Sequence, residues 1–509
     1  MTHFNRRFMI KALAGTSALA LAPLRWAASA ALTRPMPPSK EEATFLIHSE
    51  RPWALETMRS SFGFSPITPE SHFFVRNNLP MPDASIIENR DAWRFEVEGT
   101  ERSGSLSLLD LQRMNTSTVA TVLQCSGNGR AFFPHKPSGS QWGIGAAGCA
   151  LWTGVSVADV LELFGGAKDG LKFLTTTGGE TIPEGIDFDQ VAVQRSVLLD
   201  KGLKDCMLVW EMNGAPISLA HGGPLRLIVP GYYGVNNVKW VKKIAATAEE
   251  SGAEIQQTGY RVRDIGQSGG PQHPSMWRMD VKSWINGPGA DDKPVLPGRH
   301  YIYGVAFSGE RGIEKVEVSA DHGRSWEPAE LVGPDLGPNA WRTFKHQVDL
   351  SLGKTRYVSR ATDLAGDSQP QKRKENHRGY GNTSWEDAGL EINVVSELPK
   401  FVPAPKKIAA ASSAVVAAVA KTSTKLSAKA MQGKDIYLTK AQPNCGVCHT
   451  LADAGSQGAV GPNLDVLKPT EAQVSQAISQ GVGIMPSFGA QLSSDEIAAL
   501  AAYVAETTR

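Results

Sequence analysis

The sequence predicts an α+β protein in three consecutive parts: a mixed α+β domain, a β-sandwich and an all-α domain. Three observations predict this architecture. The 509 residues are enough for about three domains of roughly 150 residues each. Apolar residues alternate with polar ones in the third quarter of the chain, as in half-buried strands. Near the end of the chain they recur every three to four residues, as on one face of a helix.

Composition and charge exclude several classes of protein. The chain is 41% hydrophobic and 20% charged, values typical of a folded globular protein. Its 52 Lys and Arg nearly balance its 51 Asp and Glu, so nothing favours nucleic acid as a partner. Five cysteines are too few for a disulfide-built scaffold. No uncharged apolar run reaches the ~18 residues of a membrane span, so we expect none.

Residues 1–30 have the pattern of an export signal. Arg6 and Arg7 precede a short apolar stretch at 12–24, and Ala28-Ser29-Ala30 forms a small-x-small cleavage site. The paired arginines favour the twin-arginine route, which exports folded proteins. We therefore expect a mature chain that begins near Ala31 in a bacterial periplasm. An ordinary secretory signal that contains two arginines is the alternative.

The first folded part is expected over residues 31–265, where strand and helix patterns mix. Trp93, Phe95 and Val97 alternate with polar residues, which predicts a half-buried strand. Ser156 precedes an apolar helical pattern and is a candidate helix N-cap. The segment therefore predicts one α+β domain.

The second part, 266–397, is predicted to be all-β. Val316, Val318 and Ala320 alternate with polar residues, and the turn-forming run Asp321-His322-Gly323 follows them. Short strands separated by turn signals are typical of a β-sandwich.

A linker and a small helical domain complete the chain. Residues 398–427 are rich in Pro, Ala and Lys and contain one aromatic residue, a composition typical of a linker. In the last part, 428–509, Ser493 and Glu496 predict a capping box. The apolar residues that follow them lie on one helix face: Ile497, Leu500, Ala501 and Val504.

The run Cys445-Gly-Val-Cys448-His449 is the attachment pattern of a c-type haem. Two thiols at this spacing bind the two vinyl groups, and the next residue presents an imidazole to the iron. Met485, followed by a proline, is the expected sixth ligand, with Met431 as a weaker candidate. The domain resembles a class I cytochrome c, which implies haem c as a cofactor.

A lone cysteine in a polar turn is the second candidate site. Cys125 ends an apolar run and is followed by Ser-Gly-Asn-Gly and Arg130. A neighbouring arginine favours the thiolate, a soft ligand for transition metals. A buried structural thiol is the alternative on composition alone. Elsewhere the domain contains donors suited to phosphate and pterin oxygens: Arg76, His221, Arg226, Asn237 and Lys239.

With these motifs in this order, residues 44–395 resemble the sulfite oxidase family of molybdenum enzymes. The resemblance implies a molybdopterin-binding domain followed by an immunoglobulin-like dimerisation domain. It implies that Cys125 is the thiolate ligand of molybdenum. It also implies that four residues hold the cofactor's pterin and phosphate: His221, Arg226, Asn237 and Lys239.

The resemblance further implies a pocket for a small oxyanion. Its members here are three arginines, a pocket-wall tryptophan and a tyrosine beside the metal: Arg76, Arg130, Arg378, Trp142 and Tyr260. Guanidinium groups that converge on one point repel one another unless an anion is bound. Asn78 departs from the family, because some members have histidine there.

These inferences predict a periplasmic sulfite dehydrogenase that oxidises sulfite to sulfate at a molybdenum centre. Its own c-type haem would pass the electrons to an external soluble cytochrome c, and the resemblance implies a homodimer. A dehydrogenase of another sulfur compound, such as sulfane sulfur, is one alternative. Others are a reductase of S- or N-oxides and an electron carrier whose large domain no longer holds molybdenum.

Overall fold

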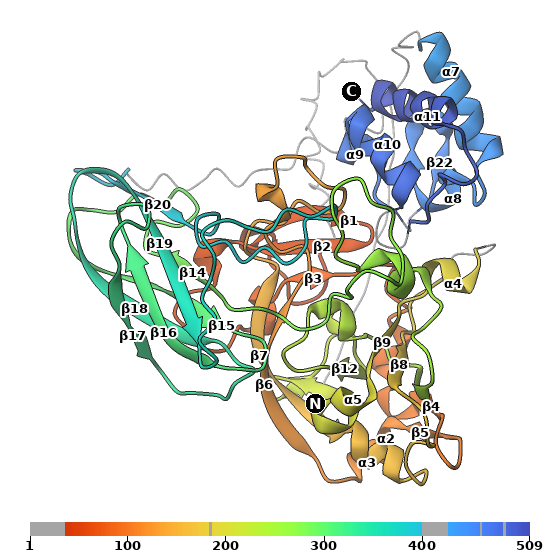
Figure 1. Cartoon of the computed structure of the whole chain (residues 1–509), viewed down its shortest axis with the longest axis horizontal. Coiled ribbons are helices and arrows are strands. Elements are labelled where there is room, and N and C mark those ends of the chain that lie inside the picture. The colour runs from red at the N-terminus through yellow and green to blue at the C-terminus, as the bar shows by residue number, and fades with distance from the viewer. Residues whose placement is uncertain (1–35, 183–185, 400–425, 459–460, 482–484, 509) are drawn as a thin grey trace, which may run out of the picture. The chain divides into compact units, whose positions relative to one another are not determined.

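The computed structural model describes residues 36–182, 186–399, 426–458, 461–481 and 485–508. The predicted signal peptide and most of the predicted linker lie outside these ranges. Among the described residues, no helix is long and apolar enough to cross a membrane. Figure 1 shows the helices and strands of the chain.

The first part contains three sheets, which confirms the mixed α+β prediction. A small antiparallel sheet comprises β1 (Phe45–Glu50), β2 (Trp53–Thr57) and β3 (Val75–Arg76). A second sheet comprises β6 (Ser117–Gln124), β7 (Ala147–Ser156), β10 (Met207–Met212), β11 (Ala215–Pro216) and β12 (Arg226–Ile228). The third comprises β4 (Arg94–Glu98), β5 (Gly104–Ser107), β8 (Phe173–Thr177), β9 (Gln194–Leu198) and β13 (Lys243–Thr247).

Short helices join these strands. They are α1 (Ser85–Glu88), α2 (Leu108–Gln112), α3 (Val157–Glu162), α4 (Phe188–Val191) and α5 (Leu199–Asp205). The Ser156 side chain accepts a hydrogen bond from the Asp159 amide, so the predicted N-cap is confirmed. The predicted alternation at 93–97 is also confirmed, because Phe95 and Val97 of β4 are buried and their strand neighbours are exposed or half-buried. These residues share an apolar core with Val160 and Leu161.

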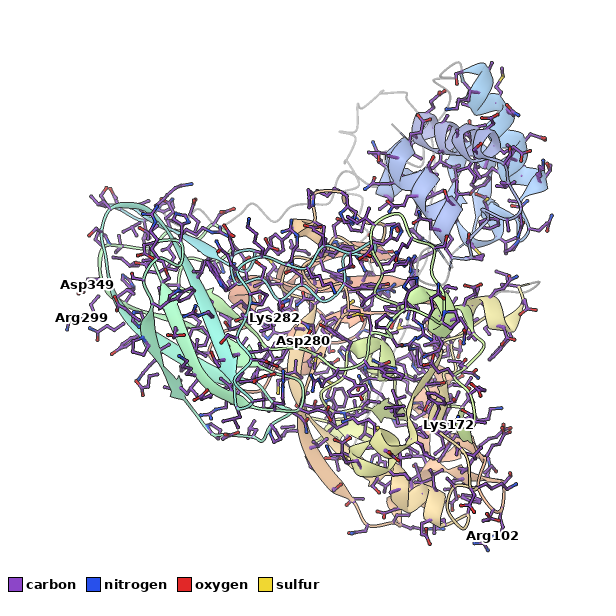
Figure 2. The ribbon with its side chains drawn as sticks, in the orientation of Figure 1. Arg102, Lys172, Asp280, Lys282, Arg299 and Asp349 are labelled. Atoms are coloured by element: carbon purple, nitrogen blue, oxygen red, sulfur yellow. The ribbon has the colours of Figure 1, made fainter. Side chains whose placement is uncertain are left out.

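The second part is a seven-stranded antiparallel β body. Its strands pair in the order β14-β15-β18-β17-β16-β19-β20. Their bounds are β14 (Lys282–Gly287), β15 (Gly298–Phe307), β16 (Ile313–Ser319), β17 (Glu327–Val332), β18 (Arg342–Leu350), β19 (Gly353–Asp363) and β20 (Leu390–Val394). Val316 and Val318 are buried in its core as predicted. Arg299 and Asp349, opposite each other on β15 and β18, pair at 3.8 Å at one end of this body (Figure 2).

The last part is helical, as predicted. Its helices are α7 (Ala428–Asp435), α8 (Cys445–Cys448), α9 (Leu464–Leu467), α10 (Glu471–Gln480) and α11 (Ser494–Thr507), and β21 (Thr450–Leu451) pairs with β22 (Ser456–Gln457). The capping box of Ser493 and Glu496 is confirmed at the start of α11. Leu500, Ala501 and Val504 of that helix are buried in the domain core.

Candidate active site

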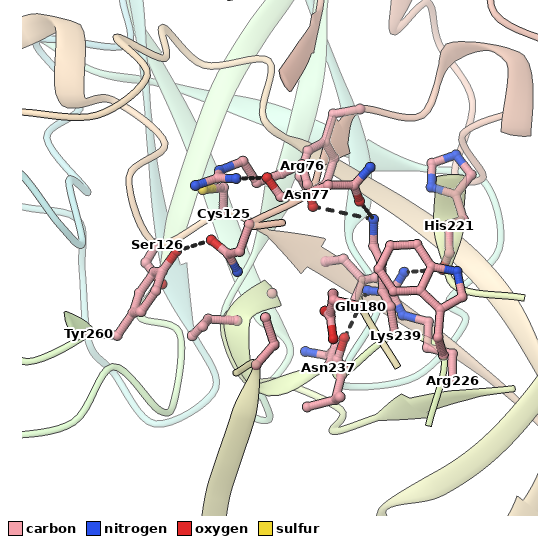
Figure 3. A pocket seen from close by; sticks show the side chains of 18 of the residues that line it. Arg76, Asn77, Cys125, Ser126, Glu180, His221, Arg226, Asn237, Lys239 and Tyr260 are labelled. Carbon is pink, nitrogen blue, oxygen red and sulfur yellow. Dashed lines mark hydrogen bonds between the residues drawn. The ribbon is translucent and has the colours of Figure 1, made fainter. Parts of the chain in front are cut away.

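A pocket with about 670 Å³ of empty space, part of it open solvent, lies in the first part of the chain. Its lining includes seven of the residues that the sequence singled out: Arg76, Cys125, His221, Arg226, Asn237, Lys239 and Tyr260. Figure 3 shows Arg76, Cys125 and Tyr260 on one side of this pocket and His221, Arg226 and Lys239 on the other. We call the two groups the thiol end and the cationic end.

Cys125 is presented by a tight turn at the end of β6. Its amide donates to the carbonyl of Ala146 (2.9 Å), and its own carbonyl accepts from the amide of Asn128 (2.9 Å). The Asn128 side chain bonds to both sides of the hairpin, to Gln124 Oε1 (3.0 Å) and to the Ala146 amide (3.1 Å). Gly129 has φ +98°, a conformation that favours glycine. The turn therefore holds Cys125, a residue that is 8% exposed, at the pocket wall.

At the thiol end, Tyr260 directly follows a π-helical turn, Ile255–Gly259. Its hydroxyl donates to Asn78 Oδ1 (3.2 Å). Burial raises the pKa of Tyr260 to about 12, and the charge of Arg76 opposes this shift. Tyr260 is therefore a neutral hydrogen-bond donor at physiological pH. Asn78, the departure from the family pattern, partners this tyrosine.

At the cationic end, Lys239 and Arg226 are held by backbone carbonyls and, for Lys239, by one side chain. Lys239 Nζ donates to Asn77 Oδ1 (2.5 Å) and to the carbonyl of Ala220 (2.6 Å). Arg226 donates to the carbonyls of His221 (2.6 Å) and Asn237 (3.2 Å). Burial lowers the pKa of Arg226 to about 9. Burial, together with the charge of Arg226, also lowers the pKa of Lys239 to well below its usual value. Desolvation of these cations is relieved when an anion binds beside them.

His221 and Asn237 complete the cationic end in different ways. Burial first, then the neighbouring lysines, hold the pKa of His221 well below its usual value, so the imidazole is neutral. Asn237 uses its whole amide on the backbone: Oδ1 accepts from the Val229 amide (2.8 Å), and Nδ2 donates to the carbonyls of Tyr232 (3.3 Å) and Tyr233 (3.1 Å). Asn237 therefore fixes the pocket wall, whereas His221 presents a ring edge to it.

Several buried polar atoms of this pocket lack a hydrogen-bond partner among the residues that the structure describes. They are Asn77 Nδ2, Ser126 Oγ, Glu180 Oε2, His221 Nε2 and Arg226 Nε. His221 Nε2 is 3.4 Å from Glu70 Oε1 but forms no hydrogen bond to it. Unsatisfied buried groups are costly, and a polar ligand satisfies them. Together with a thiol at one end and cations at the other, they fit a long polar cofactor with a metal at one end and an anionic group at the other.

Three predicted residues lie next to the pocket lining rather than in it. Arg130 is buried behind the turn of Cys125 and donates from Nε to the carbonyl of Arg378 (3.0 Å). Arg378 is likewise buried, with its guanidinium carbon 5.7 Å from the ring centroid of Tyr380. Trp142 is fully buried in the apolar cluster that contains Cys125. The roles assigned to these three residues stay predictions.

The pocket also contains residues that the sequence did not single out. Asn77 and Ser126 are direct neighbours of predicted residues, so their positions could have been found from that proximity. Glu180 follows two glycines at the end of β8, and a polar turn after a strand is the signal that points to it. Burial raises the pKa of Glu180 to about 8, so its carboxyl group is largely protonated at pH 7.

The predicted haem site is formed locally. The Nδ1 atom of His449 donates to the carbonyl of Pro462 (2.9 Å), which leaves Nε2 as the ring nitrogen available to iron. A Cβ at Gly461 would lie 2.3 Å from Cε1 of His449, so only glycine fits against this ring. The thiols of Cys445 and Cys448 are free and partly exposed. Met485 packs against the domain core, whereas Met431 is 57% exposed. These residues fit haem c.

Comparison with known proteins agrees with both sites. Residues 79–255 match the family described as oxidoreductase molybdopterin binding domain, and 273–392 match the Mo-co oxidoreductase dimerisation domain. Sulfite oxidase of Arabidopsis thaliana is 31% identical over 384 residues, which cover 68% of this chain and 93% of the plant protein. The chain belongs to the sulfite oxidase family of molybdenum enzymes. It is thus a molybdenum oxidoreductase of this family, and a molybdopterin cofactor is implied.

Further relatives and a further family model also match this sulfite oxidase family member. Mitochondrial sulfite oxidase of Rattus norvegicus is 32% identical over 367 residues, which cover 68% of this chain and 65% of the rat protein. The crystal structure of the sulfane dehydrogenase SoxCD from Paracoccus pantotrophus is 25% identical, with a TM-score of 0.56 over 68% of this chain and 85% of that chain. Residues 428–504 match the family described as cytochrome c oxidase, cbb3-type, subunit III, which implies haem c.

Proposed function

We propose that the protein is a sulfite dehydrogenase that passes electrons from a molybdenum centre through its own haem c to an external cytochrome c. The observation that carries the proposal is the thiol end of the pocket, where Cys125, Arg76 and Tyr260 line one cavity. A soft thiolate ligand, a fixed cation and a neutral phenol together suit a metal-dependent reaction on a small oxyanion. When bound, the molybdenum cofactor supplies the two-electron oxidation and the oxygen atom that sulfite gains.

The chain's residues contribute binding, orientation and charge. Cys125 is held by its turn as the protein's ligand to the metal. The cationic end binds the anionic group of the cofactor, and its unpartnered atoms, Arg226 Nε and His221 Nε2, become satisfied. Arg76 attracts and orients the oxyanion beside the thiol. Preorganised charge of this kind stabilises the charge that develops in the transition state.

Tyr260 holds a proton at the reacting centre. Because the pKa of Tyr260 is raised to about 12, its hydroxyl stays protonated throughout the physiological range. The hydroxyl donates to Asn78 Oδ1 and could turn to donate to an oxygen of the substrate instead. It therefore orients the substrate by hydrogen bonding without adding a negative charge that would repel the anion.

Steady-state kinetics of the molybdenum- and haem-loaded protein test the proposal. Oxidation of sulfite coupled to reduction of a soluble cytochrome c is measured beside oxidation of a protein-bound sulfane sulfur. The same protein, reduced with dithionite, is tested for reduction of an S-oxide and an N-oxide. We expect the highest kcat/KM with sulfite. If the fully loaded protein does not turn over sulfite, the proposal is wrong.

Sulfane sulfur is the second candidate substrate. The structural similarity to the sulfane dehydrogenase SoxCD at a TM-score of 0.56 favours it. A sulfane substrate carried on a protein needs a wide entrance, whereas free sulfite needs only a small anion site. Arg76 in the pocket lining favours the small anion. A kcat/KM higher for the sulfane substrate than for sulfite would reverse this ranking.

We infer a periplasmic location from residues 1–30, with their paired Arg6 and Arg7 and their small-x-small site. Fusion of these residues to a reporter protein tests this inference. The fusion is expected to reach the periplasm, and Arg6→Lys with Arg7→Lys is expected to keep it in the cytoplasm. Export of the double variant at the unchanged rate would instead indicate the ordinary secretory route.

A further inference from the structure

A loop of the second part of the chain is bound to the turn of Cys125. This loop, 376–382, runs between β19 and β20. The amide of Gly381 donates to the carbonyl of Ser126 (2.9 Å), and Asn382 Nδ2 donates to the carbonyl of Gly129 (3.0 Å). In the opposite direction, Arg130 Nε donates to the carbonyl of Arg378 (3.0 Å). These three bonds hold the loop against the wall of the thiol end.

Tyr380 lies in this loop and contacts Tyr260 in two ways. Their rings stack with centroids 5.3 Å apart and an interplanar angle of 7°. The Tyr380 hydroxyl donates to the carbonyl of Gly259, the residue before Tyr260 (3.2 Å). Asn376 bonds to both the amide (3.0 Å) and the carbonyl (2.8 Å) of Tyr380. The backbone of Tyr380 is therefore fixed, and its ring fixes Tyr260.

The same ring lies against two guanidinium groups. The guanidinium carbons of Arg130 and Arg378 are 5.3 and 5.7 Å from its centroid, within the range of a cation–π interaction. Arg130 donates hydrogen bonds to two neutral carbonyls, those of Arg378 and Ser140. Burial lowers the pKa of Arg130, and no carboxylate in the described part of the chain is among the groups that shift it. The ring thus holds the guanidinium without neutralising its charge, and this charge stays available to an anion.

We propose that Tyr380 is a positioning residue of the oxyanion site, acting through Tyr260, Arg130 and Arg378. The proposal rests on the proposed function, since it names the anion as the ligand of that same site. An aromatic ring can hold two like-charged groups close together, because its negative face offsets part of their repulsion. A carboxylate in that place would instead compete with the substrate for the arginines. The ring also sets the direction of the Tyr260 hydroxyl.

The test compares oxyanion binding in three variants of the loaded protein. Tyr380→Leu removes the ring, Tyr380→Phe keeps the ring but loses the bond to Gly259, and pentafluorophenylalanine at this position keeps the ring size but reverses its charge distribution. Tyr301→Leu is the matched control, because Tyr301 is 52% exposed and contacts the cation of Lys345 at 5.4 Å on the same β body. The measurements are sulfate binding by calorimetry, KM and kcat for sulfite, metal content and Tm.

We expect Tyr380→Leu and the fluorinated variant to weaken sulfate binding and raise the KM for sulfite by about ten-fold. kcat is expected to change less, and metal content and Tm to stay near those of Tyr380→Phe. Tyr380→Phe is expected to bind sulfate like the unaltered protein, and so is Tyr301→Leu. If Tyr380→Leu fails to fold, sulfate binding and the KM for sulfite in the fluorinated variant, which has nearly the native shape, test the proposal.

Unchanged sulfate binding in both ring variants would overturn the proposal, as would absence of sulfate binding in the unaltered protein. Equal losses in Tyr380→Phe and Tyr380→Leu would also overturn it, because the bond to Gly259 would then carry the effect. Failure of the proposed function has a different signature. Sulfite is then not turned over by any variant, while the order of sulfate affinities among the variants still reports on Tyr380.

Discussion

The two cysteine sites of this molecule are built in opposite ways. The haem site uses two thiols and an imidazole within five consecutive residues, Cys445 to His449. The pocket around Cys125 is lined by residues from Phe73 to Tyr260, and the loop 376–382 is bound to its turn. The haem site therefore depends on a local motif, whereas the molybdenum pocket depends on the packing of distant segments. We therefore expect the haem site to tolerate substitutions elsewhere in the chain that would disturb the molybdenum pocket.

We expect the largest loss of activity when the protein's ligand to molybdenum is removed and the haem site is left unaltered. Cys125→Ser is expected to lower sulfite oxidation by more than about 100-fold, because the protein loses its soft ligand to molybdenum. Its haem is expected to remain attached and reducible by dithionite. Cys149→Ala is the control, since Cys149 is a fully buried thiol whose pKa burial raises to about 12. Sulfite oxidation at the unaltered rate in Cys125→Ser would show that Cys125 is not needed at the molybdenum site.

The next effect concerns retention of the cofactor. Lys239→Ala removes a buried cation of the cationic end, so we expect about ten-fold less molybdenum in the purified protein. The haem content, measured on the same sample, is expected to be unchanged. Lys243→Ala, in which a partly exposed lysine that pairs with Glu98 at 3.3 Å is removed, should keep its molybdenum. Equal losses of molybdenum in both lysine variants would argue against an anion site at Lys239.

A third experiment changes the haem site alone. Met485→Ala is expected to lower the haem reduction potential by on the order of 100 mV, because a thioether ligand raises it. Molybdenum content should stay the same. Met431→Ala, which alters an exposed methionine, should leave the haem reduction potential unchanged. A redox titration followed at the haem absorption bands measures the reduction potential of the unaltered protein and of both variants. If the potential shifts only in Met431→Ala, Met431 and not Met485 is the sixth ligand.

The smallest expected effect is on protein stability, at a lysine through which the β body contacts the turn of Cys125. Lys282 of β14 is 2% exposed, and its ammonium donates to the carbonyl of Asn128 (3.4 Å). Burial lowers the pKa of Lys282 from 10.5 to about 7. Between these values the unfolded chain binds more protons than the folded one, so this residue makes stability rise with pH from about 7 to 10.5.

Lys282→Met is therefore expected to be more stable than the unaltered protein at pH 7, by about 1–3 kcal/mol. The difference should shrink as the pH approaches 10. Urea unfolding at several pH values measures it, and Lys172→Met, at an exposed lysine labelled with Lys282 in Figure 2, is the control. A gain in stability that is independent of pH would mean that burial of the charge is not its cause.

Sequence patterns predicted the local features of this molecule more fully than its tertiary ones. The capping box at Ser493 and the alternation at Phe95 depend on neighbouring residues, and both are confirmed. The haem residues Cys445 and His449 come from one short motif. The turn of Cys125 was identified because glycine and polar residues follow an apolar strand, which marks a turn in any fold.

Tyr380 could not be found in this way, because its role comes from contacts with residues far away in the chain. Its ring stacks on Tyr260 only after two domains pack together. Glu180 is similar: a glutamate after two glycines is usually a solvated turn residue, and only the fold buries its Oε2 atom. Patterns of three or four residues cannot encode such long-range burial.

The most direct test of the central claim is an anaerobic visible spectrum of the fully loaded, oxidised protein before and after addition of sulfite. We expect the reduced c-type haem bands to grow, because electrons taken from sulfite at the Cys125 site reach the haem of the same chain. The same bands should stay oxidised in Cys125→Ser until dithionite is added. An oxidised haem in the unaltered, molybdenum-loaded protein after sulfite addition would contradict the account.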